Sequence, residues 1–298
     1  MQTELLIAIS AGLGGMLGWG LADFFAKKTI DRIGDVASLA WGHIFGTGVL
    51  FVMALYQFGV RGQRVAMPDD MQTWGLLLLF GVLQAVVYLF VYKGFGKGQV
   101  GLLSPVFASF SGLTAFVSIV VFGEMVGGYL LLGLATLFVG IVLINLDMRA
   151  LRSRRLSFTR IPGFREVAFA TILATLWTLG WDWFVGGQDW LSYTFFMYAA
   201  MTLAILFVAI VQRVDLFVVS RPIWKFLFLI GLCETAAYIA ISIGYSATSR
   251  TSVVALLSGA FSLPTIILAR LFLRERVTLI QTVGSLIIIA GIMLLSVL

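Results

Sequence analysis

The chain has 298 residues, of which 60% are hydrophobic and 11% are charged, and its net charge is +6. A soluble domain averages about 25% charged residues, so this composition excludes an ordinary soluble protein. The sequence holds a single cysteine, Cys233, and a single histidine, His43, which excludes an internal disulfide and a cysteine or histidine metal cluster. We therefore expect no metal and no cofactor, and we expect lipid to be the main solvent of the chain.

Ten apolar segments follow one another along the chain. A helix needs about 20 apolar residues to cross a hydrocarbon core about 30 Å thick. The segments lack the polar–apolar alternation of barrel strands, and backbone groups cannot stay unpaired in lipid, so the sequence predicts an all-α integral membrane protein with ten transmembrane helices. In chain order the segments are residues 5–26, 36–60, 71–92, 100–122, 125–146, 166–186, 190–211, 224–247, 251–270 and 277–298.

The longest break in this pattern lies between the fifth and sixth segments, where residues 147–166 hold six arginines. Of the twenty Lys and Arg residues, seventeen lie in the loops at that end of the predicted bundle, and Arg61, Arg64 and Arg250 lie in the others. Cytoplasmic loops carry the positive excess in membrane proteins. We therefore predict that this end faces the cytoplasm and that both termini face outward. Since the basic residues flank membrane spans, we expect no nucleic-acid partner.

The two halves of the chain repeat each other. A shift of 150 places Trp74 on Trp224 and Tyr88 on Tyr238, and one residue of gap then places Gly140 on Gly291. This divides the chain into five spans in residues 1–148, a basic cytoplasmic linker at 149–163, and five spans in 164–298. An odd number of spans inverts the second half, and inverted repeats are typical of transporters with a substrate site near the bilayer midplane.

Particular motifs make the likeness more specific. Trp19-Gly20 in the first span, Phe272-Leu-Arg-Glu275-Arg-Val before the last span, and Ala290-Gly-Ile-Met-Leu within it resemble the drug/metabolite transporter superfamily of the EamA type. The resemblance covers nearly the whole chain. It implies a secondary transporter in which spans one to four and six to nine surround a central cavity, with spans five and ten as a buttress. It also implies metabolite export, and aromatic amino acid exporters belong to this superfamily.

Ionisable groups within spans are costly and therefore mark functional candidates. Glu234 lies near the middle of the eighth span, and its repeat partner is Gln84, which suggests that one half has specialised. Glu234 would bind a substrate ammonium or take a proton; the alternative is a protonated Glu that only holds helices together. Asp23 and His43 are further candidates for proton coupling. For Asp23 a helix-end ion pair with Lys27 is the favoured interpretation, and for His43 it is a hydrogen-bonded packing residue.

Other residues are candidates for lining the substrate cavity or for bending a span. Aromatic side chains would stack on a planar substrate or enclose a cation, although Trp and Tyr also form belts at membrane interfaces. Pro105 and Pro264 would kink their spans or let them bend. Glu124 is interpreted as a favourable charge at the start of the fifth span and is left out of the site. The aromatic candidates for the substrate site are Trp19, Tyr88, Trp177, Trp181, Tyr238 and Phe261.

The sequence therefore predicts no catalytic residue and no enzyme, but a secondary active transporter working by alternating access in an inner membrane. We expect its substrate to be an amino acid or a related amphipathic metabolite, and protons to be a coupling ion. The alternatives are an organic cation or quaternary ammonium transporter, an integral-membrane enzyme, and a scaffold without transport. An internally duplicated chain can act as a monomer.

Overall fold

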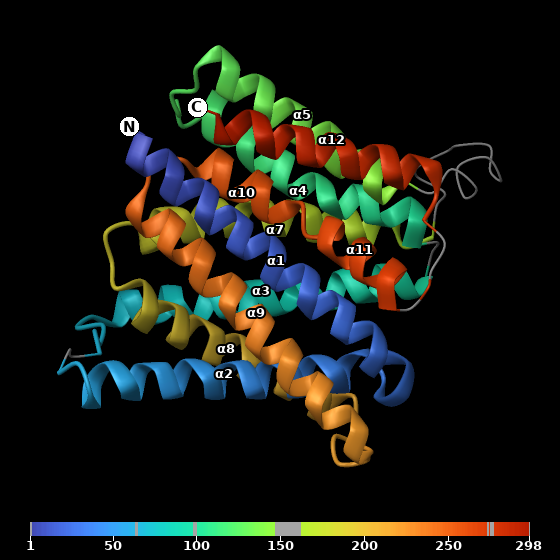
Figure 1. Ribbon diagram of the computed structural model, residues 1–298. Coiled ribbons are helices and arrows are strands. Elements are labelled where there is room, and N and C mark those ends of the chain that lie inside the picture. The colour runs from blue at the N-terminus through green and yellow to red at the C-terminus, as the bar shows by residue number, and fades with distance from the viewer. Residues whose placement is uncertain are drawn as a thin grey trace.

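The computed structural model describes residues 2–62, 65–97, 100–146, 162–272, 274 and 277–297. Every regular element within these ranges is a helix, and the helices lie side by side in one bundle (Figure 1). The predicted all-α fold is confirmed. In chain order the helices are α1 (Gln2–Ile33), α2 (Asp35–Gly59), α3 (Met71–Lys97), α4 (Val100–Val120), α5 (Gly128–Asn145), α7 (Phe164–Val185), α8 (Trp190–Val211), α9 (Arg221–Ala247), α10 (Thr251–Gly259), α11 (Ser262–Phe272) and α12 (Leu279–Ser296).

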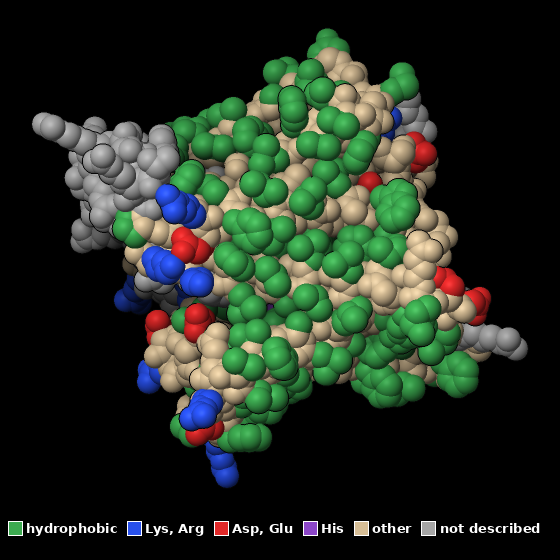
Figure 2. Space-filling model, turned by 180° about the vertical axis from the view of Figure 1, so that it is seen from behind, with side chains coloured by type: hydrophobic (Ala, Val, Ile, Leu, Met, Phe, Trp, Pro, Cys, Tyr) green, Lys and Arg blue, Asp and Glu red, His purple; other side chains and the backbone are tan. Residues whose placement is uncertain are grey.

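Among the described residues, nine helical segments are long and apolar enough to cross a membrane, with α10 and α11 together forming one of them. The predicted fourth span corresponds to a shorter apolar stretch, Val106–Val120 in α4. The outer surface suits a lipid solvent, because hydrophobic side chains cover the broad face of the bundle (Figure 2). The chain is a multi-pass membrane protein.

The first helix is longer than the predicted span. It continues to Ile33, so Asp23 and Lys27 lie inside a helix and not at its end. A span predicted from hydropathy ends at the first charged residues, whereas the helix itself can continue beyond the apolar region. The interpretation of Asp23 as a helix-end group is therefore wrong.

The two ends of the bundle differ in charge. The chain begins and ends at the same end of the bundle (Figure 1), and Lys and Arg side chains gather mainly at the other (Figure 2). Most of the predicted linker lies outside the described residues, as do Arg64, Glu275 and Arg276. Arg165 lies in the first turn of α7.

Helix α9 contacts α1, α2, α7, α8 and α10. Glycines allow these close approaches. A Cβ on Gly18 of α1 would lie 2.6 Å from the Cys233 carbonyl oxygen, and one on Gly231 of α9 would lie 2.5 Å from the Gly42 carbonyl oxygen. Small residues of this kind let helix backbones meet in membranes, where apolar burial alone does not drive helices together.

Helices α5 and α12 form a pair at the edge of the bundle (Figure 1). Glycines again set the contact: a Cβ on Gly140 would lie 2.7 Å from Ile288 N, and one on Gly291 would lie 2.9 Å from Leu137 N. Gly140 and Gly291 are the positions that the repeat superimposes. The same position in each half thus contributes to one interface.

The ninth span is divided where α10 ends at Gly259 and α11 begins at Ser262. Pro264 lies in the first turn of α11, where its missing N–H leaves no helix hydrogen bond unmade. Thr265 donates a hydrogen bond to the Gly20 carbonyl at 2.9 Å, which ties this turn to α1. Pro105, in contrast, lies inside α4, which runs unbroken from Val100 to Val120.

Candidate functional site

A buried carboxylate network lies at the middle of the bundle. Glu234 of α9 is 5% exposed. The Tyr88 hydroxyl of α3 donates to Glu234 Oε1 at 2.8 Å, and the Tyr198 hydroxyl of α8 donates to Oε2 at 3.2 Å. A buried polar group inside a membrane bundle is costly unless it is hydrogen-bonded, and helices α3 and α8 supply the donors here.

His43 of α2 completes the surroundings of Glu234. Its Nε2 lies 3.5 Å from Glu234 Oε1, and its Nδ1 lies 2.8 Å from the Leu39 carbonyl oxygen. The imidazole stacks on the Tyr198 ring, with centroids 5.1 Å apart and planes 17° apart. His43 is therefore both a packing residue and a neighbour of the buried acid.

The network has an approximate two-fold symmetry. Gln84 Nε2 donates to the Tyr238 hydroxyl at 2.9 Å, just as Tyr88 binds Glu234. The shift of 150 exchanges Gln84 with Glu234 and Tyr88 with Tyr238, so these two contacts are equivalent. The two hydroxyl oxygens are 3.5 Å apart, and the symmetry axis passes between them.

Helices α2 and α8 also contact each other through residues that the repeat relates. A shift of 155 places Thr47 on Thr202 and His43 on Tyr198. Thr47 Oγ1 and Thr202 Oγ1 are hydrogen-bonded at 2.8 Å, and His43 stacks on Tyr198. The inversion implied by the odd span count thus places equivalent residues face to face.

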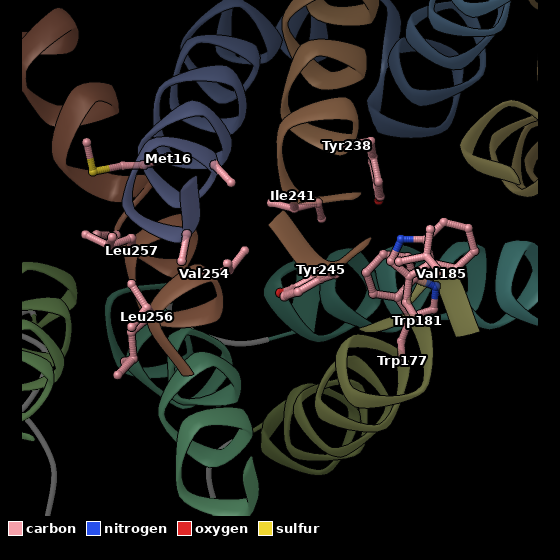
Figure 3. Packing of buried hydrophobic residues seen from close by; sticks show 14 of the residues in the cluster. Met16, Trp177, Trp181, Val185, Tyr238, Ile241, Tyr245, Val254, Leu256 and Leu257 are labelled. Atoms are coloured by element: carbon pink, nitrogen blue, oxygen red, sulfur yellow. The ribbon is translucent and has the colours of Figure 1, made fainter. Parts of the chain in front are cut away.

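Aromatic side chains surround Tyr238. The rings of Trp19 and Trp177 stand edge-on to it, with centroids 5.7 and 5.9 Å away, and Phe261 lies 6.4 Å beyond Trp19. Figure 3 shows Trp177 and Trp181 on α7 facing the helix that carries Tyr238. Trp181 stacks on Trp177 and donates to Ser242 Oγ at 3.0 Å, so its indole N–H is occupied.

Four buried polar atoms in or beside this network lack a hydrogen-bond partner among the described residues: Trp19 Nε1, Gln84 Oε1, His43 Nε2 and Thr235 Oγ1. The first two lie on the side of the network that carries Tyr238. An indole N–H only donates, and an amide oxygen only accepts. Buried polar groups are normally satisfied, so each such atom calls for an explanation. A solute that carries both an acceptor and an N–H donor would satisfy Trp19 Nε1 and Gln84 Oε1.

Asp23 of α1 adds a second acid. It lies one helical turn from Trp19, its side chain is exposed, and its carboxylate interacts electrostatically with Glu234 and with Lys27. The structure thus brings Glu234, Gln84, Tyr88, Tyr238 and His43 into contact, with Trp19, Trp177 and Phe261 around them and Asp23 nearby. Trp181 lies one turn farther along α7, and Pro264 lies in the first turn of α11, outside the hydrogen bonds of this network.

Sequence reasoning did not find Tyr198, which binds Glu234 directly. Its signal was the repeat itself, because the shift of 155 pairs Tyr198 with His43, a residue already selected. Asn145 was also missed. Its Oδ1 accepts hydrogen bonds from Ser104 at 2.7 Å and from Ser262 at 3.0 Å, which joins α5 to α4 and α11.

Glu124 has a different place from the one predicted. Its carboxylate accepts hydrogen bonds from the Ser252 backbone N–H at 2.9 Å and from the hydroxyls of Ser252 and Ser118. Ser252 lies in the first turn of α10, whereas α5 begins later, at Gly128. The charge of Glu124 therefore stabilises the N-terminus of α10 in the other half, and the prediction that it opens the fifth span is wrong.

Glu124→Ala is expected to destabilise the protein by about 1.5–3 kcal/mol, the range of hydrogen bonds to charged groups, because the first turn of α10 loses its acceptor. Thermal unfolding in detergent measures this effect. Glu4→Ala is the matched control, because Glu4 is an exposed acid in the first turn of α1. Equal unfolding temperatures for the two variants would contradict the assignment.

Comparisons with known proteins agree with this architecture. Residues 6–146 and 165–297 each match the EamA-like transporter family. Twenty-nine chains of solved structures are similar to this one. One of them, titled only as a protein crystal structure, is 15% identical with a TM-score of 0.78, and the match covers 100% of this chain and 97% of that one. At this identity the likeness shows the fold alone.

A comparison with curated proteins gives no match. The family model, however, matches both halves of the chain, and those halves hold the helices that build the Glu234 network. The chain therefore belongs to the EamA-like transporter family, a group of the drug/metabolite transporters that move small molecules across membranes.

Proposed function

We infer that the chain exports small amphipathic metabolites that carry a protonated amine, with amino acids first among them, by alternating access across an inner membrane. The observation that carries this inference is Glu234, a buried acid held by Tyr88, Tyr198 and His43 from three other helices. An acid kept in this setting is an anchor for an ammonium group. Rocking of one half against the other would expose it to each side in turn.

The unpartnered atoms beside Glu234 support an amino acid. Gln84 Oε1 needs a donor such as an ammonium N–H, and Trp19 Nε1 needs an acceptor such as a carboxylate oxygen. An amino acid carries both groups on one carbon. The aromatic rings around Tyr238 would then contact its side chain.

A second candidate substrate is an organic cation, including a quaternary ammonium. It is favoured by the same rings, since Trp and Tyr faces attract cations, and by Asp23 as a second acid near Glu234. A quaternary ammonium has no N–H, however, and leaves Gln84 Oε1 without a donor.

The test is flux into proteoliposomes across a panel of amino acids, primary amines and quaternary ammonium compounds, with and without a proton gradient. Substrate-dependent flux of amino acids supports the first reading, and flux of quaternary cations alone supports the second. The absence of flux for every compound would contradict transport of amine-bearing solutes.

We also propose that the end of the bundle rich in Lys and Arg faces the cytoplasm. In a chain whose Cys233 is replaced by Ala, Gln188→Cys is expected to react with an impermeant maleimide in intact cells, and Gln212→Cys only after permeabilisation. Both glutamines are exposed and lie at opposite ends of α8. The reverse pattern would overturn the orientation and leave the fold unaffected.

A further inference from the structure

Two lysines from different halves of the chain gather on one aromatic ring. Lys28 Nζ of α1 lies 5.0 Å from the centre of the Phe226 ring, and Lys225 Nζ of α9 lies at the same distance from it. Lys28 Nζ also lies 5.1 Å from the centre of the Phe24 ring. The two ammonium groups are therefore within about one screening length of each other, which is about 10 Å at 0.1 M salt, and they repel each other.

No carboxylate pairs with these two charges. Among the described residues neither lysine forms an ion pair, although Asp31 follows Lys28 on the same helix. Lys97, at the same end of the bundle, is paired with Glu166 at 2.5 Å. Contact with the Phe226 ring offsets part of the repulsion between the lysines, and an anion between their ammonium groups would offset the rest.

Each lysine lies at the end of a face that is exposed to lipid. Lys225 shares a face of α9 with Phe228 and Leu232, whose side chains are 44% and 39% exposed. Lys28 shares a face of α1 with Leu17, which is 50% exposed and lies about three turns before it. Long basic side chains in such places reach from the apolar region to the level of the lipid headgroups.

The surface between the two lysines is apolar. The end of α1 and the start of α9 lie side by side at the end of the bundle opposite the termini (Figure 1), and the rings of Phe25 and Phe226 meet there with centroids 6.2 Å apart. Phenyl rings offer no hydrogen bond to a hydrated soluble ion. Two positive charges beside an apolar surface instead match a phosphate group that is attached to acyl chains.

We propose that the surface formed by Lys28, Lys225, Phe25 and Phe226 binds the headgroup of an anionic phospholipid. The phosphate lies between the two ammonium groups, and the acyl chains follow the exposed faces of α1 and α9. The orientation proposed above places this end of the bundle in the leaflet that carries anionic lipid. Since α1 belongs to the first half of the chain and α9 to the second, the lipid bridges the two halves, whichever solute the chain transports.

The experiment compares phosphatidylglycerol with phosphatidylcholine on the full chain in detergent. The first lipid is anionic and the second is zwitterionic, and with identical acyl chains the difference between them isolates the charge of the headgroup. Native mass spectrometry measures binding, and thermal unfolding measures the stabilisation that binding causes. Phosphatidylglycerol is expected to bind more tightly and to raise the unfolding temperature more. Equal binding of the two lipids overturns the proposal.

Variants of the surface test its residues. Lys28→Gln combined with Lys225→Gln is expected to reduce the preference for phosphatidylglycerol about 30-fold, from about 5-fold for each lysine beside an anionic lipid. Phe226→Leu keeps the surface apolar but removes the ring that both lysines contact, and is expected to weaken phosphatidylglycerol binding by about 2- to 5-fold. An unfolding temperature without lipid like that of the unaltered chain shows that each variant is folded.

Lys93→Gln combined with Arg165→Gln is the matched control. It also removes two positive charges from exposed side chains at the basic end, but on α3 and α7, and Lys93 lies over a ring of its own, Phe90. This variant is expected to keep the preference for phosphatidylglycerol. Equal losses in the two double variants would assign the preference to the overall charge of that end and overturn the site.

Glycerol 3-phosphate separates the lipid from a soluble anion. It carries the phosphate without acyl chains, so we expect no binding at the concentrations at which phosphatidylglycerol binds. Binding as tight as that of the lipid would show a site for soluble phosphates and would overturn the lipid assignment.

Discussion

Glu234→Gln is expected to weaken amine binding by about 10- to 100-fold and to stop amine transport at low substrate concentration. The size follows from the roughly 1.5–3 kcal/mol of a hydrogen bond to a charged group, which the amide does not provide to an ammonium. The fold should survive, because Gln has nearly the same shape and can still accept from Tyr88. Binding of labelled ethylamine, together with proteoliposome flux, measures both quantities.

The two-fold arrangement offers a matched control for this variant. Gln84→Glu combined with Glu234→Gln moves the acid to the equivalent position, where it would meet Tyr238 as Glu234 now meets Tyr88. We expect this swap to recover part of the ethylamine affinity, because the charge returns to the same network. If Glu234→Gln binds ethylamine as well as the unaltered chain does, Glu234 is not the anchor.

Gly231→Ala is expected to destabilise the protein by about 1–3 kcal/mol, the usual cost of overpacking a tight contact. The added Cβ would lie 2.5 Å from the Gly42 carbonyl oxygen and 2.6 Å from Gly46 N. Both atoms belong to the backbone of α2, so neither can move aside without displacing the helix that carries His43. Thermal unfolding in detergent measures the loss, and we expect amine binding to weaken with it.

Gly48→Ala is the control for this change. Gly48 lies inside α2, is exposed, and has nothing within 4 Å of an added Cβ. Replacing a helix-interior glycine with alanine there is expected to stabilise the protein by about 0.5–1 kcal/mol. Opposite shifts at Gly231 and Gly48 would show that helix contact decides the cost, whereas equal shifts would contradict the close α2–α9 approach.

The fold could be predicted well because lipid leaves few choices. Unbroken apolar runs must form helices in a bilayer. The first residues of the predicted third and seventh spans, 71 and 190, are also the first residues of α3 and α8. The end of α1 could not be predicted this way, because Lys27 and Arg32 stop the apolar run but do not stop a helix. The break before Ser262 could not be predicted from hydropathy either, because one apolar stretch runs from Thr251 to Phe272 across it.

The candidate site could be predicted only in part. Glu234 and Gln84 were visible because polar residues are rare in spans and because the repeat superimposes them. The bonding of Glu124 to Ser252 was not visible, since it joins two halves through a contact between residues 128 positions apart. Tyr198 was hidden for the opposite reason, because a tyrosine in a membrane span has several ordinary explanations.

The face-to-face placement of Tyr88 and Tyr238 bears on how such a site can arise. Two identical five-helix chains meeting around this axis would form a homodimer in which every residue occurs twice, so an acid at the position of Glu234 would be matched by a second acid at the position of Gln84. One polypeptide escapes that constraint: it can keep a single acid, and it holds its halves at an effective concentration on the order of millimolar. Covalent fusion of the two halves thus allows a duplicated fold to carry a site with one charge.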